Sequence, residues 1–333
     1  MTSASAPVVL ILGANGRFGL AAAKAFAAAG WRVLAQVRRA AAAGMPARAE
    51  LVRAPLESLA AALAGSPVPS VVVHAVNPIY TRWDEEALPA ARAGMDLAER
   101  LGARFMLPGN VYNYGEAMPP LLDEATPQRP TTAKGRIRAE MEGELERRAD
   151  AGRLRSTVIT AGDFYGDGNG SWLDLAIVKP IKKGRLDYPG DLDTMHAWGY
   201  LPDLARAFVA VAEAPGLAAF ERFTFAGHAL TGRDFLAAVE RAAESLGLAP
   251  ARAWKHGRMP WAVIRALGVV VPLWRELARM SYLWRVSHAL AGEKLAARCP
   301  TLTTTTLDEA LRLSLVALGL DAAPKRIGEH VST

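Results

Sequence analysis

Residues 8–19, which read VVLILGANGRFG, constrain the fold of this 333-residue chain more than any other stretch. Five apolar residues, three of them β-branched, predict a strand that is buried on both faces. Three glycines follow at intervals of three, and the Ala-rich segment 20–29 then predicts a helix. A strand, a glycine turn and a helix in this order predict a phosphate-binding site, because the helix N-terminus presents unpaired N–H groups.

The three glycines have separate expected roles in that turn. Gly13 lets the chain reverse tightly, Gly16 lets a pyrophosphate approach the backbone, and Gly19 lets the helix pack close to the strand. The alternative is a tight turn that holds no ligand. The residues between the glycines are assigned to the same predicted cofactor site: Asn15, Arg17 and Phe18.

Strands and helices alternate along the first half of the chain. Strands are expected at residues 32–37, 50–53, 70–76, 104–107 and 154–160, and the longer helices at 84–101 and 132–148. This alternation predicts an α/β fold of the Rossmann type, with a doubly wound parallel sheet covered by helices on both faces. Beyond residue 166 the alternation gives way to loops and mostly helical segments, which predict a smaller C-terminal domain.

Four motifs resemble those of the extended branch of the short-chain dehydrogenase/reductase family, which includes NAD(P)-dependent epimerases and dehydratases. They are the Gly-x-x-Gly-x-x-Gly turn, Val111-Tyr112, Phe164-Tyr165-Gly166 and Leu201-Pro202-Asp203-Leu204. The resemblance implies a dinucleotide-binding domain at residues 1–168, to which the chain returns at about 198–226. It also implies a smaller substrate-binding domain at residues 169–197 and 227–333.

The end of the second predicted strand bears on the choice of cofactor. At this position a carboxylate binds the ribose hydroxyls of NAD, whereas an arginine accommodates the 2′-phosphate of NADP. This chain has Arg38 and Arg39 there and no acidic residue nearby, which favours NADP over NAD with Arg38 as the main contact. The family resemblance further implies that Ala75 and Asn77 lie near the nicotinamide ribose and that Tyr165 lies near the carboxamide.

Catalysis in the resembled family depends on Ser, Tyr and Lys. Lys134 occupies the lysine position, and because this lysine also holds the nicotinamide ribose in that family, the resemblance implies that Lys134 contacts the cofactor. Pro130 stands at the tyrosine position and Pro108 at the serine position. Two replacements are open: Lys134 exchanges the proton itself, or Tyr112 does so from the end of a strand. For Tyr112 the alternative is a packing role. Lesser candidates are Asp163 and His196.

These observations predict an NADP(H)-binding oxidoreductase that acts by hydride transfer on a small carbonyl, hydroxyl or sugar-like substrate. Two alternatives stay open. One is a non-catalytic NADP-sensing regulator, like the NmrA-like relatives of the resembled family, and the other is a nucleotide-sugar epimerase or dehydratase. No metal site is expected.

The composition restricts the partners and the location. The net charge of +6 comes without a recognisable nucleic-acid motif, so no nucleic-acid partner is expected. The longest uncharged apolar run, residues 266–274, is too short to span a bilayer. The single cysteine, Cys299, and an N-terminus without the basic region of a signal peptide favour the cytoplasm. A homodimer is left open.

Residues 251–300 form a basic stretch that is rich in tryptophan. This stretch has nine basic residues against two acidic ones, together with four tryptophans. Three interpretations are open: a pocket for an anionic or lipophilic substrate, an interfacial membrane surface, or core helices with a solvated basic face.

Overall fold

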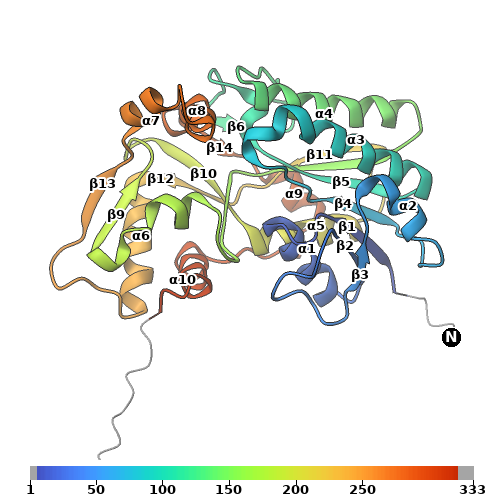
Figure 1. Ribbon diagram of the computed structural model, residues 1–333, viewed down its shortest axis with the longest axis horizontal. Coiled ribbons are helices and arrows are strands. Elements are labelled where there is room, and N and C mark those ends of the chain that lie inside the picture. Colours follow the sequence, from blue (N-terminus) through green and yellow to red (C-terminus); the bar gives the residue numbers. More distant parts are fainter. Residues whose placement is uncertain (1–5, 322–333) are drawn as a thin grey trace, which may run out of the picture.

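A seven-stranded parallel sheet forms the centre of the protein in a computed structural model that describes residues 6–321 (Figure 1). The strand order is β11 (Phe220–Thr224), β7 (Arg155–Thr160), β5 (Arg104–Gly109), β4 (Val71–His74), β1 (Val8–Leu12), β2 (Arg32–Val37) and β3 (Glu50–Arg53). All neighbouring strands run parallel, which confirms the predicted α/β fold of the Rossmann type. Most of the N-terminal segment used to predict the location lies outside the described residues.

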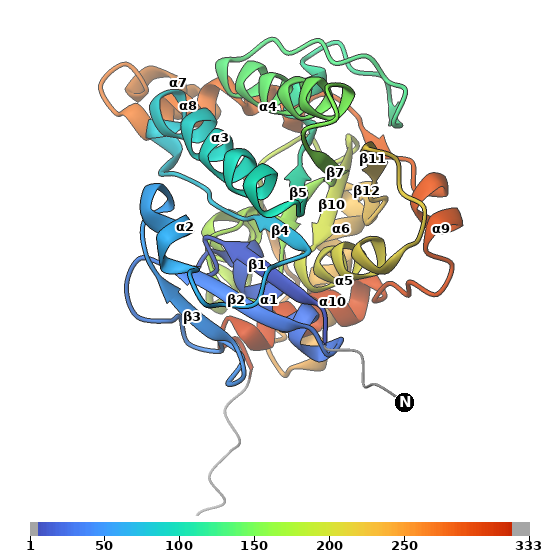
Figure 2. The same cartoon turned by 90° about the vertical axis from the view of Figure 1, so that its right-hand side faces the viewer.

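Strand β1 is buried on both faces, as its sequence predicts. Val9 and Ile11 pack with α1 (Arg17–Ala28) and α5 (Leu201–Glu213) on one side of the sheet. Leu10 and Leu12 pack on the other side with α2 (Leu59–Ala62), α3 (Trp83–Leu101) and α4 (Ala133–Asp150). Figure 2 shows the sheet between these two layers of helices. The alternation of β1 side chains between two cores therefore fixes the position of the glycine turn that follows it.

Most of the remaining elements gather beyond the carboxyl ends of the central strands, whereas segment 293–298 packs against β11. Three small sheets contain β12 (His228–Thr231), β10 (Met195–Tyr200) and β8 (Asp163–Tyr165); β13 (Lys255–Arg258) and β9 (Arg185–Tyr188); and β14 (Ala289–Leu290) and β6 (Leu121–Leu122). The helices are α6 (Gly232–Ser245), α7 (Trp261–Leu267), α8 (Pro272–Arg279), α9 (Glu293–Arg298) and α10 (Leu307–Ala317). Short helical turns lie at Leu56–Ser58, Tyr80–Arg82, Val111–Tyr114, Leu173–Ile177, Ile181–Lys183 and Ser281–Trp284. Helix α6 packs against α10 around a third apolar core.

Residues 6–321 contain neither a membrane-spanning helix nor a cluster of metal ligands. No helix in this range is both long enough and apolar enough to cross a membrane. No group of three or more His, Cys, Asp or Glu side chains in the same range is arranged to hold a metal ion.

A buried carboxylate fixes the loop that follows β5. Glu142 of α4 is 1% exposed and accepts hydrogen bonds from Asn113 Nδ2 at 2.7 Å and Gln128 Nε2 at 2.6 Å. It also pairs with Arg222 Nε of β11 at 3.2 Å. Because Asn113 is the neighbour of Tyr112, this network holds the backbone that carries a predicted catalytic residue.

Replacing Glu142 with alanine is expected to lower the free energy of unfolding by about 2 to 4 kcal/mol, because Arg222 and Asn113 lose their acceptor. Urea unfolding measures this change. The matched control is Glu146→Ala on the same helix, where the side chain is exposed and the expected change is within about 0.5 kcal/mol. Equal stability of the two variants would show that the network does not hold the loop.

Candidate functional site

The glycine turn between β1 and α1 forms a cradle of main-chain atoms. Gly13 has a φ of +74°, and a Cβ there would lie 3.0 Å from the main chain of Ala75. A Cβ at Gly19 would lie 2.3 Å from the Gly13 carbonyl oxygen. Gly16 is the N-cap of α1, and no side chain of the described residues caps this helix end. The first N–H groups of α1 are thus free to bind an anion, so the turn fits the pyrophosphate of a dinucleotide.

Two polar side chains shape the loop on the far side of this turn. The buried Gln36 of β2 accepts a hydrogen bond from Gly13 N–H at 2.8 Å and donates to Ala54 O at 2.6 Å. Asn15 donates to Ala40 O at 2.8 Å, and its carbonyl accepts from the Ala42 N–H at 2.8 Å. Both polar atoms of the Asn15 side chain are therefore hydrogen-bonded within the protein. We expect the main chain of Asn15 to make the predicted cofactor contact.

The predicted NADP-binding arginines lie exposed in this same loop. Arg38 and Arg39 follow the last residue of β2. Within the described part of the chain, neither guanidinium has a carboxylate within ion-pair distance. The loop therefore leaves both groups accessible to an anion.

The side chains of Arg17 and Phe18 point away from each other. The Arg17 guanidinium donates to the carbonyl oxygens of Gly166 at 3.1 Å and Gly170 at 3.3 Å, and burial lowers the pKa of this group. The Phe18 ring packs edge-on against Phe208 with centroids 4.8 Å apart. Arg17 therefore ties the loop after β8 to the glycine turn, whereas Phe18 belongs to the core that joins α1 to α5.

The carboxyl ends of three adjacent strands deliver polar side chains to one place. Tyr80 follows β4, Tyr112 follows β5 and Asp163 follows β7. The Tyr80 and Tyr112 side chains lie close enough to influence each other, and Asp163 is close enough to act on both electrostatically. Burial raises the pKa of both phenols, and for Tyr112 the Asp163 carboxylate raises it further. Both tyrosines therefore stay protonated near neutral pH.

Two of the predicted ribose neighbours lie at the end of β4. Ala75 is buried with its main chain against Gly13, and Asn77 is exposed two residues further on. Both follow β4, which pairs with β1, so they lie at the same edge of the sheet as the glycine turn. A dinucleotide bound to the turn would pass along this edge.

Lys134 is buried at the start of α4, and its charge is neutralised. Its Nζ donates to Tyr80 O at 2.7 Å and pairs with Glu276 Oε2 of α8 at 3.0 Å. The same atom lies 4.3 Å from the centroid of the Tyr80 ring. Nearby, Arg138 donates to Pro108 O at 3.0 Å and lies over Trp83. Lys134 thus holds neighbouring segments together, and its proposed part in proton transfer stays a prediction.

Asp163 and His196 form a buried pair beside the tyrosines. His196 Nε2 lies 2.9 Å from Asp163 Oδ2, and Nδ1 lies 3.3 Å from Leu283 O. Both ring nitrogens of His196 therefore lie close to oxygen atoms of the protein, which fixes the orientation of the ring. The His196 ring stacks on Trp284 with centroids 4.2 Å apart. These two lesser candidates of the sequence are brought together with Tyr112.

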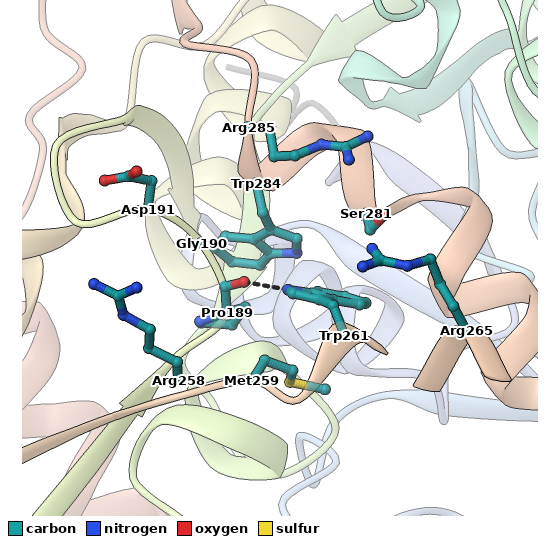
Figure 3. Close-up of a pocket in the computed structure, with 10 residues that line it drawn as sticks. All are labelled: Pro189, Gly190, Asp191, Arg258, Met259, Trp261, Arg265, Ser281, Trp284 and Arg285. Atoms are coloured by element: carbon teal, nitrogen blue, oxygen red, sulfur yellow. Dashed lines mark hydrogen bonds between the residues drawn. The ribbon is translucent and has the colours of Figure 1, made fainter. Parts of the chain in front are cut away.

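A pocket lined by arginines lies next to Trp284. Its volume is about 190 Å³, and Figure 3 shows three arginines, Arg258, Arg265 and Arg285, and one carboxylate, Asp191, around it. Trp261 lines the pocket from α7 and donates its indole N–H to Pro189 O at 2.5 Å. Because Trp284 touches both the pocket and His196, an anionic group held here would lie near the Asp163–His196 pair.

The Tyr165 side chain is hydrogen-bonded within the protein. The side chain is fully enclosed, and its hydroxyl lies 2.8 Å from His228 Nδ1. The other nitrogen of His228 lies 2.9 Å from Thr305 O, so the tyrosine donates and the imidazole accepts. A cofactor contact at Tyr165 stays a prediction. Because the hydroxyl is bonded to His228, we expect the main chain of Tyr165 to make this contact.

Three residues of the site were not predicted from the sequence. Tyr80 follows a predicted strand, so the rule that ligands bind at the carboxyl ends of strands could have found it. Gln36 carried a signal too, as a polar residue within an apolar strand. Nothing in the sequence pointed to Glu276 except that it is an acidic residue within a basic stretch.

Comparison with known proteins identifies the family. Residues 9–222 match the NAD dependent epimerase/dehydratase family. No curated protein matches the sequence of this chain. Similar solved structures include a putative epimerase from Burkholderia cenocepacia, with 21% identity, 94% of this chain and 98% of the other covered, and a TM-score of 0.71. The UDP-glucose 4-epimerase of Thermotoga maritima has 16% identity, coverages of 93% and 98%, and a TM-score of 0.69.

A third structure, the L-threonine dehydrogenase of Clostridium difficile, has 14% identity, coverages of 94% and 98%, and a TM-score of 0.72. At these identities the structures confirm the fold alone. The family match extends over most of the chain and confirms the resemblance and the oxidoreductase class that the motifs predicted. The chain belongs to the NAD-dependent epimerase/dehydratase family.

Proposed function

We propose that the protein is an NADP(H)-dependent oxidoreductase that acts on a small carbonyl or hydroxyl compound carrying an anionic group. One observation carries this proposal: Tyr112 and the Asp163–His196 pair meet at the carboxyl edge of the sheet, beside a pocket lined by arginines. The glycine turn lies at the same edge, so a dinucleotide bound there has its reactive end near these groups.

The residues that hold the cofactor follow from the geometry of the turn. The free N–H groups of α1 bind the pyrophosphate, and Arg38 binds the 2′-phosphate. When bound, the cofactor supplies or accepts a hydride at its nicotinamide ring.

The proton is handled by Tyr112 and the Asp163–His196 pair. Reduction of a carbonyl adds a hydride to carbon and a proton to oxygen. Tyr112, protonated because burial raises the pKa of its hydroxyl, donates a hydrogen bond to the substrate oxygen. Tyr112 then transfers its hydroxyl proton to that oxygen, and a proton from solvent restores the phenol by way of the neighbouring Asp163–His196 pair. Oxidation runs the same steps in reverse.

A second candidate function is a cofactor-sensing regulator without turnover. The observation that favours it is the Lys134–Glu276 pair, because a lysine bound to a carboxylate is not free to assist chemistry. A third candidate, a nucleotide-sugar epimerase or dehydratase, is supported by the family description. Turnover separates the enzyme from the regulator, and net oxidation or reduction of the substrate separates the oxidoreductase from the epimerase.

Wild-type protein is expected to bind NADPH about 10- to 100-fold more tightly than NADH, because a charge-assisted bond to phosphate contributes about 1.5–3 kcal/mol. Replacing Arg38 with alanine should remove most of this preference and leave the affinity for NADH unchanged. Fluorescence titration with both cofactors measures it, and Arg48→Ala, an exposed arginine of the same loop, is the control. Equal affinities in the wild type would refute the choice of NADP.

Tyr112→Phe keeps the ring and removes the hydroxyl, so it should reduce turnover by about 100-fold or more with little change in cofactor affinity. Lys134→Met leaves Glu276 with the exposed Arg279 as its remaining ion-pair partner, so the effect of Lys134 is measured in the double variant Lys134→Met/Glu276→Gln. In that background an anchoring lysine weakens cofactor binding, and a proton-transferring lysine also reduces turnover. Full turnover in Tyr112→Phe would show that the proton comes from another group.

A further inference from the structure

The tip of the α7–α8 hairpin exposes an aliphatic surface that the proposed function does not use. The run from Ala266 to Trp274 contains no charged residue. Val269 is 79% exposed and Val270 is 75% exposed, and Leu267 and Leu273 are more than two-fifths exposed. These side chains form one continuous turn between two helices, unlike the isolated exposed Val68 elsewhere in the chain.

Two arginines flank the tip of the hairpin, and the neighbouring acidic residue, Glu276, is buried. Arg265 and Arg275 border the uncharged run on either side, and both are exposed. Within residues 6–321, neither has a carboxylate within 4 Å. Glu276 is the only acidic residue of segment 251–286, and it is buried against Lys134. The hairpin is therefore apolar at its tip and carries an exposed arginine on either side of it, Arg265 toward the pocket of Figure 3 and Arg275 on α8.

From this surface we infer that the α7–α8 hairpin docks on a membrane that contains anionic phospholipid. Aliphatic side chains bury in the interface between headgroups and acyl chains, and arginines attract the lipid phosphates. The hairpin lies at the outer edge of the molecule, at the upper left of Figure 1, so no other segment in that view stands between its tip and a flat surface. Helices α7 and α8 are far shorter than a bilayer is thick, so the contact is superficial.

A second copy of the chain fits this surface less well. A symmetric contact at the tip would bring Arg265 and Arg275 of both copies together without a facing carboxylate, and such like charges repel. An anionic lipid surface offers acyl chains to the apolar turn and phosphate groups to the arginines. Docking also fixes the orientation of the active site, because Glu276 ties α8 to Lys134 at 3.0 Å.

Sedimentation of the full-length protein with vesicles tests this inference. Vesicles of phosphatidylcholine with about 30% phosphatidylserine should bind the protein at low salt, whereas pure phosphatidylcholine vesicles should bind at least 10-fold less. High salt should weaken the binding. Val269→Asp should reduce binding at least 10-fold, and Arg275→Gln about five-fold.

Matched controls make the result specific to the hairpin. Val68→Asp introduces the same charge at a residue that is 68% exposed in a distant loop, and Arg147→Gln removes an exposed arginine from α4. Neither control should change the binding. The inference is overturned if the wild type does not bind the anionic vesicles or if Val269→Asp binds as well as Val68→Asp. It is also overturned if Val269→Asp only converts a dimer into a monomer in sedimentation velocity. None of these readouts depends on the cofactor or on turnover.

Discussion

The structure depends on the close approach of helix α1 to strand β1. A Cβ at Gly19 would lie 2.3 Å from the Gly13 carbonyl oxygen, and a Cβ at Gly13 would lie 3.0 Å from the main chain of Ala75. Only glycine permits these distances together with a φ of +74° at Gly13. The same approach inserts Phe18 against Phe208 and leaves the N-terminus of α1 at the edge where ligands bind. Packing of the sheet and binding of the phosphates are thus consequences of one constraint.

A buried ion pair joins this framework to the C-terminal part of the chain. Lys134 and Glu276 are both largely removed from water, which costs several kcal/mol unless the charges are paired and hydrogen-bonded. The 3.0 Å pair and the bond to Tyr80 O offset this cost. The position of α8 therefore depends on the one residue that the chain retains from the catalytic set of the resembled family. This dual use explains why the proton is better assigned to Tyr112 and the Asp163–His196 pair.

Local patterns predicted the framework well because each strand and helix is specified by its own residues. The strand expected at 32–37 has the same bounds in the structure, and the helix expected at 132–148 runs from Ala133 to Asp150. The partners of buried polar groups could not be predicted, because they come from distant segments. Tyr165 bonds to His228 from another strand, and Lys134 to Glu276 from a helix of the basic stretch. Spacing along the chain carries no information about such pairs.

Titration of NADPH into wild-type protein and the Gly16→Val variant tests the central claim most directly. Gly16 has φ −69° and ψ 159°, which suit a β-branched residue, and its Cβ would meet the Gly13 carbonyl oxygen at 3.2 Å, so a small adjustment keeps the fold. The added side chain stands beside the N–H groups that bind the pyrophosphate. We expect the wild type to bind NADPH, and the variant to keep its thermal unfolding transition but bind at least 100-fold more weakly. Unchanged affinity in the folded variant would contradict dinucleotide binding at this turn.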